Sequence, residues 1–572
     1  MTSSRFEKLP FAKETIEVWG NTDPRNRNWP VVYTIFNDKQ IYVGETTNAA
    51  SRLGQHLGSQ TKNGLKDVRV VFDDSFNKSV CLDLESHLIR YFAADEKFNV
   101  LNGNGGISDA DYFERDKYRE AFKAVFDQHL ESGMLTRSVP EIVNSDFFKY
   151  SPFKALNTEQ AVAINEILEG LLPVIKKDPG QTFVVQGDPG TGKTIVAVYL
   201  MKLLNDIEHA IDEDALESNS VFSDFFFEGY KESLHGAKIG LIVPQQSLRK
   251  TIKKVFDRTP GLSADQVMKP AEAVKSGEYF DLLIVDEAHR LKQRANQASA
   301  MQNTEFTDIN QKLFGVDDKS KNQLDWLKAI SRHQLLLLDT LQTVQPMDLP
   351  PAVTKGLERT ADRNGILYRL RSQMRLVGGE DYIDYVGQLF RGTQPAPRSS
   401  FGRYDVKFFE SFQDLDQAIR SKNHEHKLAR LIAGYGWKWI SKGNKDIADF
   451  EIEGVPLTWN RTATDWINSK TSSEEVGSIH TVQGYDLNYA GVIVGPELGF
   501  DGSTQKIVFH KENYHDAKGK QNNPGRVFAD DELLEFVANI YRVLLTRGIL
   551  GTYIYVVDPS LRKHLAQYFP HA

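Results

Sequence analysis

The chain has 572 residues, of which 40% are hydrophobic and 26% charged, and its formal net charge is −8. This length exceeds what one hydrophobic core supports and indicates about three or four domains of a globular protein. Cys81 is the only cysteine, which excludes a disulfide framework and a cysteine-based zinc site. The acidic balance does not exclude nucleic acid, because motor enzymes bind it in a local channel.

The distribution of apolar residues predicts no membrane association. Residues 1–13 are polar and of mixed charge, without the apolar core of a signal peptide. No apolar run in the chain approaches the ~20 residues needed to span a bilayer. We therefore expect a cytoplasmic protein without a membrane partner, and we interpret residues 1–30 as a lead-in to the first strand.

Residues 31–107 show a compact β–β–α–β–α pattern. Strands are expected at Val31–Phe36 and Gln40–Gly44, joined by a tight turn. The helix that follows carries Arg52 and His56, which are four residues apart and therefore share one face.

A second, amphipathic helix carries Glu85, and the pattern closes at an asparagine, either Asn102 or Asn99. The ordered set of Val-Val-Tyr ending at Tyr33, Tyr-Val-Gly beginning at Tyr42, an arginine, a glutamate and an asparagine resembles a GIY-YIG nuclease domain. The resemblance covers about residues 30–106. It departs from the family pattern at the first glycine, which is valine here.

This resemblance implies cleavage of a phosphodiester bond with a single metal ion. Glu85 would bind Mg²⁺ or Mn²⁺, hard cations that prefer oxygen ligands. Tyr33 would help to activate the water, and Arg52 would stabilise the charge on the phosphorane. Tyr42 would orient the nucleophile or the phosphate. Taken singly, each residue also has a structural explanation: the tyrosines as packing, and Arg52 with Glu85 as a salt bridge.

A helical connector is expected over residues 108–155. Beyond it, a glycine-rich segment has the pattern of a nucleotide-binding motif. The apolar run 182–185 reads as a buried strand, followed by a glycine-rich turn and a helix. Glycines let successive backbone N–H groups point at a polyphosphate, while the lysine reaches the β- and γ-phosphates and the following threonine binds Mg²⁺. The sequence therefore predicts an ATP site at Gly187, Pro189, Gly190, Thr191, Gly192, Lys193 and Thr194.

Two further buried strands end in polar residues. The strand 282–285 runs into Asp286 and Glu287, which places both at the carboxyl edge of a parallel sheet. There Asp286 can hold Mg²⁺ while Glu287 orients and deprotonates the attacking water. The strand 335–338 is followed by Asp339 and Gln342, and Gln342 can contact the γ-phosphate.

These pieces resemble a superfamily 1 helicase, and more closely the Schlafen-type DNA/RNA helicase domain, over about residues 156–560. The segment Ile242–Leu248 resembles the motif that touches the nucleic-acid backbone, and His289 suits a DEAH-type box. By the same resemblance, five further residues from other motifs would read adenine, contact nucleotide or neutralise charge on the transferred phosphoryl group. They are Gln160, Arg375, Gln483, Gly484 and Arg547.

The expected fold is α/β: a small GIY-YIG domain followed by two RecA-like parallel-sheet domains, residues 156–347 and residues 348–572 with insertions. The expected function is an ATP-driven DNA translocase fused to a metal-dependent endonuclease, in defence against foreign DNA or in repair. Its partner would be single- or double-stranded DNA, with RNA open and protein partners undetermined. Two alternatives stay open: a translocase whose N-terminal domain is an inactive nucleic-acid clamp, and a regulatory ATPase that acts on RNA.

Overall fold

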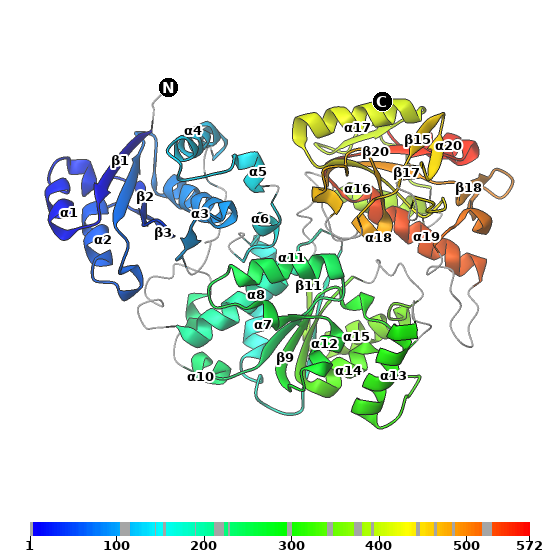
Figure 1. Cartoon of the computed structure of the whole chain (residues 1–572), viewed down its shortest axis with the longest axis horizontal. Helices are drawn as coiled ribbons and strands as arrows, with labels where there is room; N and C mark the ends of the chain where they lie inside the picture. Colours follow the sequence, from blue (N-terminus) through cyan, green and yellow to red (C-terminus); the bar gives the residue numbers. More distant parts are fainter. Residues whose placement is uncertain are drawn as a thin grey trace. The chain divides into compact units, whose positions relative to one another are not determined.

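A computed structural model describes the chain, shown in Figure 1. It describes residues 4–102, 112, 115–143, 145–152, 156–188, 190–210, 222–226, 229–294, 300–339, 347–370, 380–390, 394–441, 447–462, 466–482, 487–516 and 529–572. The chain packs as two compact units. One holds residues 1–175, 194–237 and 251–267, and the other holds residues 176–193, 238–250 and 268–572.

The first unit contains a five-stranded sheet in the order β1-β4-β2-β3-β5. The pairs β1–β4, β4–β2 and β2–β3 are antiparallel, whereas β3 and β5 run parallel. All six residues of β2 are buried, because the strand is central in the sheet and its side chains enter cores on both faces. The strands are β1 (Arg5–Pro10), β2 (Val31–Phe36), β3 (Gln40–Thr46), β4 (Asp67–Phe72) and β5 (Asn99–Val100).

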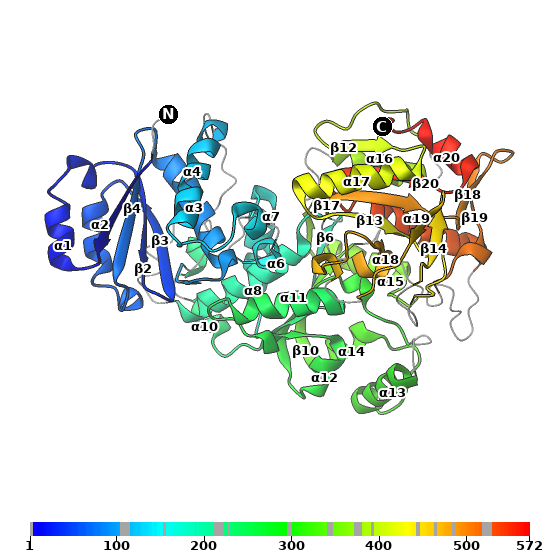
Figure 2. The same ribbon diagram turned by 45° about the horizontal axis from the view of Figure 1, so that its top comes forward.

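Helices cover both faces of this sheet, as Figure 2 shows. Alternation along β2 sends Val31, Tyr33 and Ile35 to the core with α1 (Lys13–Trp19) and α2 (Ala49–His56). It sends Val32 and Phe36 to the other core, beneath α3 (Lys78–Asp95). The observed order β2–β3–α2–β4–α3 is the order expected from the sequence.

The lead-in expected over residues 1–30 is instead part of this domain. Its strand β1 pairs along its whole length with β4, and Leu9 and Ile16 are buried in the same core as Tyr33. This strand is hard to predict from the sequence, because Arg5–Pro10 alternates weakly and ends in proline. An edge strand tolerates that proline, since the missing N–H would face away from its partner.

The helices after the sheet pack onto α3. Phe122, Val125 and Ile142 are buried in one cluster with Leu84, Leu88 and Phe92 of α3, and Val255 of the later helix α11 (Gln246–Asp257) joins them. The predicted connector is therefore built into the core of the first unit. Its helices, and those nearby in the chain, are α4 (Tyr118–Glu131), α5 (Val139–Val143), α6 (Asp146–Tyr150), α7 (Thr158–Leu171), α8 (Lys193–His209), α10 (Tyr230–Leu234) and α11 (Gln246–Asp257).

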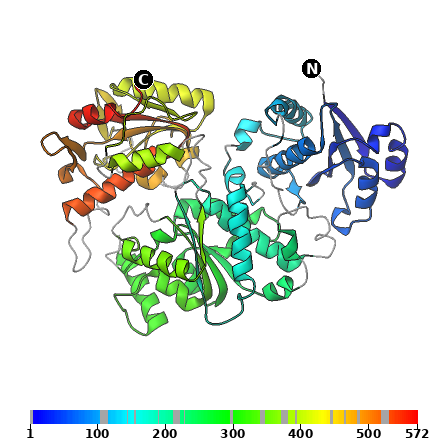
Figure 3. The same cartoon turned by 180° about the vertical axis from the view of Figure 1, so that it is seen from behind.

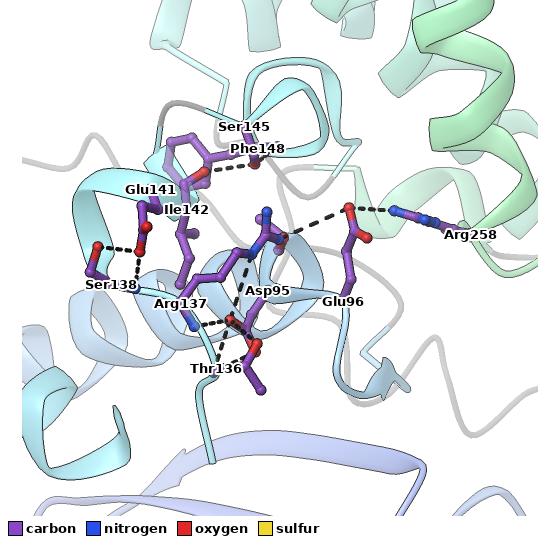
Figure 4. A network of polar contacts seen from close by, with 11 residues as sticks. Asp95, Glu96, Thr136, Arg137, Ser138, Glu141, Ile142, Ser145, Phe148 and Arg258 are labelled. Carbon is purple, nitrogen blue, oxygen red and sulfur yellow. Dashed lines mark hydrogen bonds and ion pairs between the residues drawn. The ribbon is translucent and has the colours of Figure 1, made fainter. Parts of the chain in front are cut away.

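A polar network fastens the end of α3, as Figure 4 shows. Asp95, fully buried, accepts hydrogen bonds from the backbone N–H groups of Thr136 and Arg137 and from the Thr136 hydroxyl. The helix then stops at Glu96, which takes a left-handed conformation with φ 67°. Glu96 forms an ion pair with Arg258, just beyond α11.

The second unit begins with a six-stranded sheet in the order β11-β6-β10-β9-β7-β8. The pairs from β11 to β7 are all parallel, so their carboxyl ends share one edge. The helices α12 (Pro270–Lys275), α13 (Ala300–Phe314), α14 (Gln323–Ile330) and α15 (Pro351–Arg363) contribute side chains to its core. The strands are β6 (Thr182–Gly187), β7 (Ile239–Ile242), β8 (Val267–Met268), β9 (Phe280–Val285), β10 (Ser331–Leu338) and β11 (Leu367–Leu370).

A further sheet of five strands, in the order β12-β20-β17-β13-β16, is parallel throughout. Separate cores on its two faces hold α17 and α19, which Figure 3 shows in yellow and in orange-red. The strands are β12 (Asp405–Phe408), β13 (Ala429–Ala433), β16 (Val476–Ser478), β17 (Leu487–Val494) and β20 (Gly548–Val556). The helices are α16 (Glu380–Phe390), α17 (Phe412–His426), α18 (Ile479–Val482), α19 (Asp530–Leu545) and α20 (Pro559–Ala566).

Two short hairpins accompany this sheet, β14 (Phe450–Ile452) with β15 (Val455–Leu457) and β18 (Leu498–Asp501) with β19 (Lys506–Phe509). The α/β class with parallel sheets is thus as expected. Within the described part of the chain, no helix combines the length and apolar character that a membrane span requires.

Candidate active sites

The glycine-rich turn between β6 and α8 has the geometry of a phosphate-binding loop. Gly190 and Gly192 have φ values of 89° and 81°, in the left-handed region that glycine adopts without strain. A Cβ on Gly187 would lie 2.5 Å from Thr191 Oγ1, so this position also requires glycine. The loop therefore depends on its glycines for both conformation and space.

Lys193, the first residue of α8, is directed back over this loop. Its Nζ donates hydrogen bonds to the carbonyl oxygens of Gly187 at 2.6 Å and Asp188 at 3.0 Å. The same Nζ lies 3.5 Å from Asp339 Oδ2, at the end of β10. A buried ammonium is thus held inside the curl of the loop, where it can meet a polyphosphate.

Asp286 and Glu287 follow β9 at the carboxyl edge of the same sheet. Asp286 is fully buried and accepts a hydrogen bond of 3.0 Å from the backbone N–H of Glu287. Glu287 has φ 48° and ψ 45°, a left-handed conformation that is unusual outside glycine and asparagine. Such strain persists only where the surroundings hold it, and it is common at functional sites.

The surroundings of Glu287 are cationic. Its Oε2 lies 3.3 Å from His289 Nε2 and 3.1 Å from Arg290 Nε. Burial alone would raise the pKa of this carboxyl, but His289, Arg290 and Lys193 outweigh it and hold the pKa well below its usual range. Glu287 is therefore anionic at neutral pH and can accept a hydrogen bond from water.

Gln160 and Arg547 are two further predicted residues of the motor that lie within the described part of the chain. Gln160 serves as the third residue of a capping box on α7: its Oε1 accepts from the backbone N–H of Asn157, whose Oδ1 accepts in return. The pattern Asn-x-x-Gln already predicts such a box. Arg547 is buried just after α19. Pro189, Gln342, Arg375, Gln483 and Gly484 lie outside the described residues.

The N-terminal sheet brings its predicted residues together. Tyr33 Oη forms a hydrogen bond of 2.7 Å with His56 Nε2 of α2, and the Tyr42 ring centroid lies 5.0 Å from that of His56. Burial, together with the nearby Lys62 and Arg52, lowers the pKa of His56 to about 3. The imidazole is therefore neutral and available as a partner for the tyrosine hydroxyl.

Tyr33 keeps its proton in this setting. Burial and then Tyr42 raise the pKa of its phenol well above the usual value, Arg52 opposes this, and Glu85 adds to it. These electrostatic contacts bring the four predicted residues into one neighbourhood. Gly44 belongs to it as well, since a Cβ there would lie 2.5 Å from Tyr33 Cζ; sequence analysis used this glycine only as part of the Tyr-Val-Gly pattern.

Glu85 on α3 is the carboxyl of this site, and its pKa is raised to about 8. Burial is the main cause and the Glu45 carboxylate the next, while Lys78 acts in the opposite direction. Lys78 itself is ion-paired with Glu45. Glu45 directly follows the Tyr-Val-Gly pattern, but only the structure shows that it belongs to the site.

Asn102 is the asparagine that closes the domain. Its side chain accepts a hydrogen bond of 3.0 Å from the Val43 backbone N–H and donates one of 2.8 Å to the Val43 carbonyl. Asn99 instead pairs through its backbone in β5. The amide of Asn102 thus continues the parallel pairing of β5 with β3 and fixes the strand that carries Tyr42.

Both sites offer the oxygen ligands that Mg²⁺ and Mn²⁺ prefer. Glu85 supplies a carboxylate in the first unit, and Asp286 supplies one at the P-loop sheet. Among the described residues, no three or more histidine, cysteine, aspartate or glutamate side chains group together as a metal site. A cation at either place would therefore complete its coordination with water and phosphate oxygens, as Mg²⁺ commonly does.

A parallel sheet whose carboxyl edge carries a P-loop lysine and an Asp-Glu pair defines a P-loop nucleoside triphosphatase. Residues 180–558 match the Schlafen group 3 DNA/RNA helicase domain. The chain belongs to this family, and its central and C-terminal part is a nucleic-acid helicase domain.

One curated relative is the uncharacterized protein YPL245W of Saccharomyces cerevisiae, 24% identical over 414 residues, or 67% of this chain and 83% of the yeast protein. Solved structures that are similar include yeast Dbp5 bound to RNA and ADP-BeF3 (12% identity, 73% of this chain and 89% of that one, TM-score 0.29). The arterivirus nonstructural protein 10 helicase with DNA is 12% identical (TM-score 0.27), covering 68% of this chain and 62% of its own. These TM-scores are too low to bear on the fold.

Proposed function

We propose that residues 156–572 form a motor that couples ATP hydrolysis to movement along nucleic acid, with DNA as the substrate. The observation that carries the proposal is the gathering of Lys193, Asp286 and Glu287 at the carboxyl ends of β6 and β9. Lys193 binds the β- and γ-phosphates, and Thr194 and Asp286 would hold the metal, which neutralises phosphate charge when bound. Glu287 orients the attacking water.

Cations are needed opposite this edge to stabilise the charge on the transferred phosphoryl group. Arg547 is our candidate within the described residues, with Arg375 as its partner by motif. Gln160 would read adenine, and Gln342, Gln483 and Gly484 would contact nucleotide. Because Gln160 also caps α7, loss of its side chain should lower helix stability as well as nucleotide affinity.

The test is an ATPase assay on the full chain with single- and double-stranded DNA and RNA. We expect turnover that nucleic acid stimulates and that Lys193→Ala and Glu287→Gln abolish. Lys319→Ala, at an exposed position, is the matched control and should behave as the unmodified protein. Stimulated turnover that survives both site substitutions would refute the motor. Stimulation by RNA alone would favour the regulatory RNA-dependent alternative.

We further propose that residues 31–107 cleave DNA with the help of one divalent cation bound at Glu85. The supporting observation is the hydrogen bond between Tyr33 and His56 beside that carboxyl. Because Tyr33 is protonated, it cannot act as a free phenolate. Instead its oxygen accepts a hydrogen bond from the attacking water while its O–H donates to His56 Nε2. Tyr33 thus positions the water, and the proton that the water loses passes to solvent, because the low pKa of His56 makes the imidazole a weak base.

The remaining residues position the substrate in this scheme. Arg52 neutralises charge on the phosphorane, and Tyr42 orients the phosphate. Water attacks phosphorus, one P–O ester bond breaks, and the leaving oxygen takes a proton from solvent. The metal supplies charge neutralisation when bound.

Labelled DNA incubated with Mg²⁺ or Mn²⁺ tests cleavage in the same tubes as the ATPase assay. Glu85→Ala should remove cleavage, whereas Glu14→Ala, on the exposed face of α1, should not. Cleavage that survives Glu85→Ala would show that the activity does not belong to this site. Defence against foreign DNA and repair are the settings in which a motor that feeds a nuclease is useful.

The raised pKa of Glu85 also favours the alternative of an inactive clamp, because a protonated carboxyl binds no cation. In that case the domain would bind DNA without cutting it. Binding measured by anisotropy, with no cleavage in either metal up to pH 9, would select the clamp.

A further inference from the structure

Arg290 joins two parts of the motor that the sequence motifs treat separately. It ends the 3₁₀ turn η6 (Ala288–Arg290) after β9, and its side chain is 13% exposed. Its Nε lies 3.1 Å from Glu287 Oε2, and its Nη1 donates a hydrogen bond of 3.3 Å to Gln245 Oε1. A single guanidinium therefore contacts both the Glu287 carboxylate and the loop after β7.

The loop after β7 is held as a unit at the same edge of the sheet. β7 pairs in parallel with β9, so residues that follow the two strands are neighbours. Arg249 Nη1 donates to the carbonyls of Val243 at 2.7 Å and Pro244 at 3.1 Å. Gln245 Nε2 donates to Ser247 Oγ at 3.1 Å. A shift of this loop would therefore carry the Gln245 carboxamide with it.

Glu287 has a strained backbone, and its carboxylate has two competing partners. Its backbone is left-handed, and one carboxylate oxygen, Oε2, faces both His289 and Arg290. His289 Nδ1 in turn accepts from the Asp339 backbone N–H at 3.3 Å. The carboxylate is thus shared between a partner fixed to β10 and a partner fixed to the Gln245 loop.

Arg290 also has donor capacity to spare. Its Nη2 is buried and makes no hydrogen bond within the described part of the chain. An unsatisfied buried donor costs free energy, so an arrangement in which this nitrogen gains a partner is favoured once the loop or the carboxylate moves. This is what a two-position contact requires.

We propose that Arg290 is a positioning residue that conveys to Glu287 whether nucleic acid occupies the segment Val243–Ser247, which is the loop after β7 and the first two residues of α11. The proposal rests on the motor function proposed above, in which this loop contacts the nucleic-acid backbone. When nucleic acid engages the loop, Gln245 moves, Arg290 follows, and Glu287 is turned towards the attacking water. Nucleic acid then accelerates hydrolysis without touching the nucleotide.

The test compares ATPase activity with and without saturating single-stranded DNA in Arg290→Met, which keeps the length of the side chain but no donor. We expect the ratio of stimulated to unstimulated kcat to fall by about tenfold. The KM for ATP and the Kd for DNA should change by less than about threefold, because Arg290 lies between the two ligands. Arg290→Lys should recover only part of the ratio, since one ammonium cannot reach both partners.

A double-mutant cycle with Gln245→Met checks that the two residues act together. If they form one relay, Gln245→Met lowers the ratio alone, and adding Arg290→Met lowers it no further. Arg359→Met, on the exposed side of α15, is the control for removing an arginine. Gln245→Met also serves as the primary test if Arg290→Met does not fold.

Three outcomes would overturn the relay: a stimulation ratio that stays within twofold of the unmodified value, additive losses in the cycle, or a loss of DNA affinity that accounts for the whole effect. Failure of the motor proposal looks different. In that case the unmodified chain would show no stimulation by any nucleic acid.

Discussion

Two glutamates, Glu85 on helix α3 and Glu287 just after strand β9, show how neighbouring charges determine the protonation of a buried carboxyl. Burial raises the pKa of both Glu85 and Glu287. Around Glu287 the neighbours are His289, Arg290 and Lys193, and the net pKa is low. Around Glu85 the strongest charged neighbour is another carboxylate, Glu45, and the net pKa is about 8.

The consequence is that the two sites differ in how they are regulated by proton concentration. Glu287 is ionised throughout the neutral range, so the motor should depend on nucleic acid and nucleotide more than on pH. Glu85 holds a proton near neutrality, so a cation must displace it to bind. The same residue type is thus ionised at neutral pH in one site and protonated there in the other.

The most severe test separates the sites entirely. Lys193→Ala should lower kcat of ATP hydrolysis by about 10²–10³-fold, because it removes a cation aimed at the phosphates. Mn²⁺ binding in the absence of nucleotide, measured by electron paramagnetic resonance, should not change. A joint loss would mean that the two sites are not chemically independent.

A pH series should expose the gate at Glu85. The apparent affinity for Mn²⁺ is expected to rise by about tenfold per pH unit and to level off above about pH 8, as the carboxyl loses its proton. Glu45→Gln removes the neighbouring negative charge and should move the plateau to lower pH. An affinity that is flat from pH 6 to pH 9 would contradict the raised pKa.

The same shift has a stability counterpart with a definite sign. Between the unperturbed pKa of 4.5 and about 8, the folded chain holds a proton that the unfolded chain has lost. Stability without metal should therefore fall as pH rises through this window and level off above it. Glu85→Gln should flatten the fall, which thermal unfolding of the metal-free protein would show.

A smaller effect is expected at the motor site. His289→Asn removes one of the partners that lower the pKa of Glu287, so an acidic limb should appear at higher pH in the ATPase profile. We expect a shift of about one unit. Because the pKa starts well below 4.5, kcat should fall several-fold only below about pH 5 and should stay nearly unchanged at pH 8. An unchanged profile would mean that Arg290 and Lys193 suffice.

The smallest expected effects concern the end of α3. Asp95→Asn weakens a buried, charged acceptor and should lower the local unfolding free energy of α3 by about 1.5–3 kcal/mol. Glu96→Gln breaks the ion pair with Arg258, in which Glu96 is 35% and Arg258 49% exposed, and a longer one of 4.0 Å with Arg137. Both pairs are partly exposed, and their loss should cost less than about 1 kcal/mol. Hydrogen exchange of the α3 amides measures both, and equal losses would contradict this ranking.

Local patterns carried most of what the sequence predicted. Lys193 and its glycines fall within eight consecutive residues, and Asp286 follows its strand directly, so neighbouring positions sufficed to place them. The partner of Tyr33 could not be inferred in this way. His56 lies 23 residues away on another element, and only packing of α2 against β2 decides that its Nε2 meets the hydroxyl.

Pairings between distant segments explain the other differences. The strand β1 can be recognised only by its pairing with β4. The effect of Glu45 on the pKa of Glu85 can be recognised only once α3 is placed beside β3. For Gln160, in contrast, the local pattern Asn-x-x-Gln already indicates the capping box that the structure has. The helicase resemblance implies a different role for the same side chain, namely adenine recognition. The roles of Arg375, Gln483 and Gly484 remain predictions of the motif alone.

Gly44 links chemistry to the evolutionary history of the N-terminal domain. Any side chain at this position would collide with Cζ of Tyr33, an atom that phenylalanine also has. Replacing Tyr33 by phenylalanine therefore gives no relief, and neither position can drift while the other stays as it is. Lineages that give up the tyrosine for a smaller residue are free to lose the glycine afterwards. Co-occurrence of the two residues among relatives should therefore mark the lineages that still use this site.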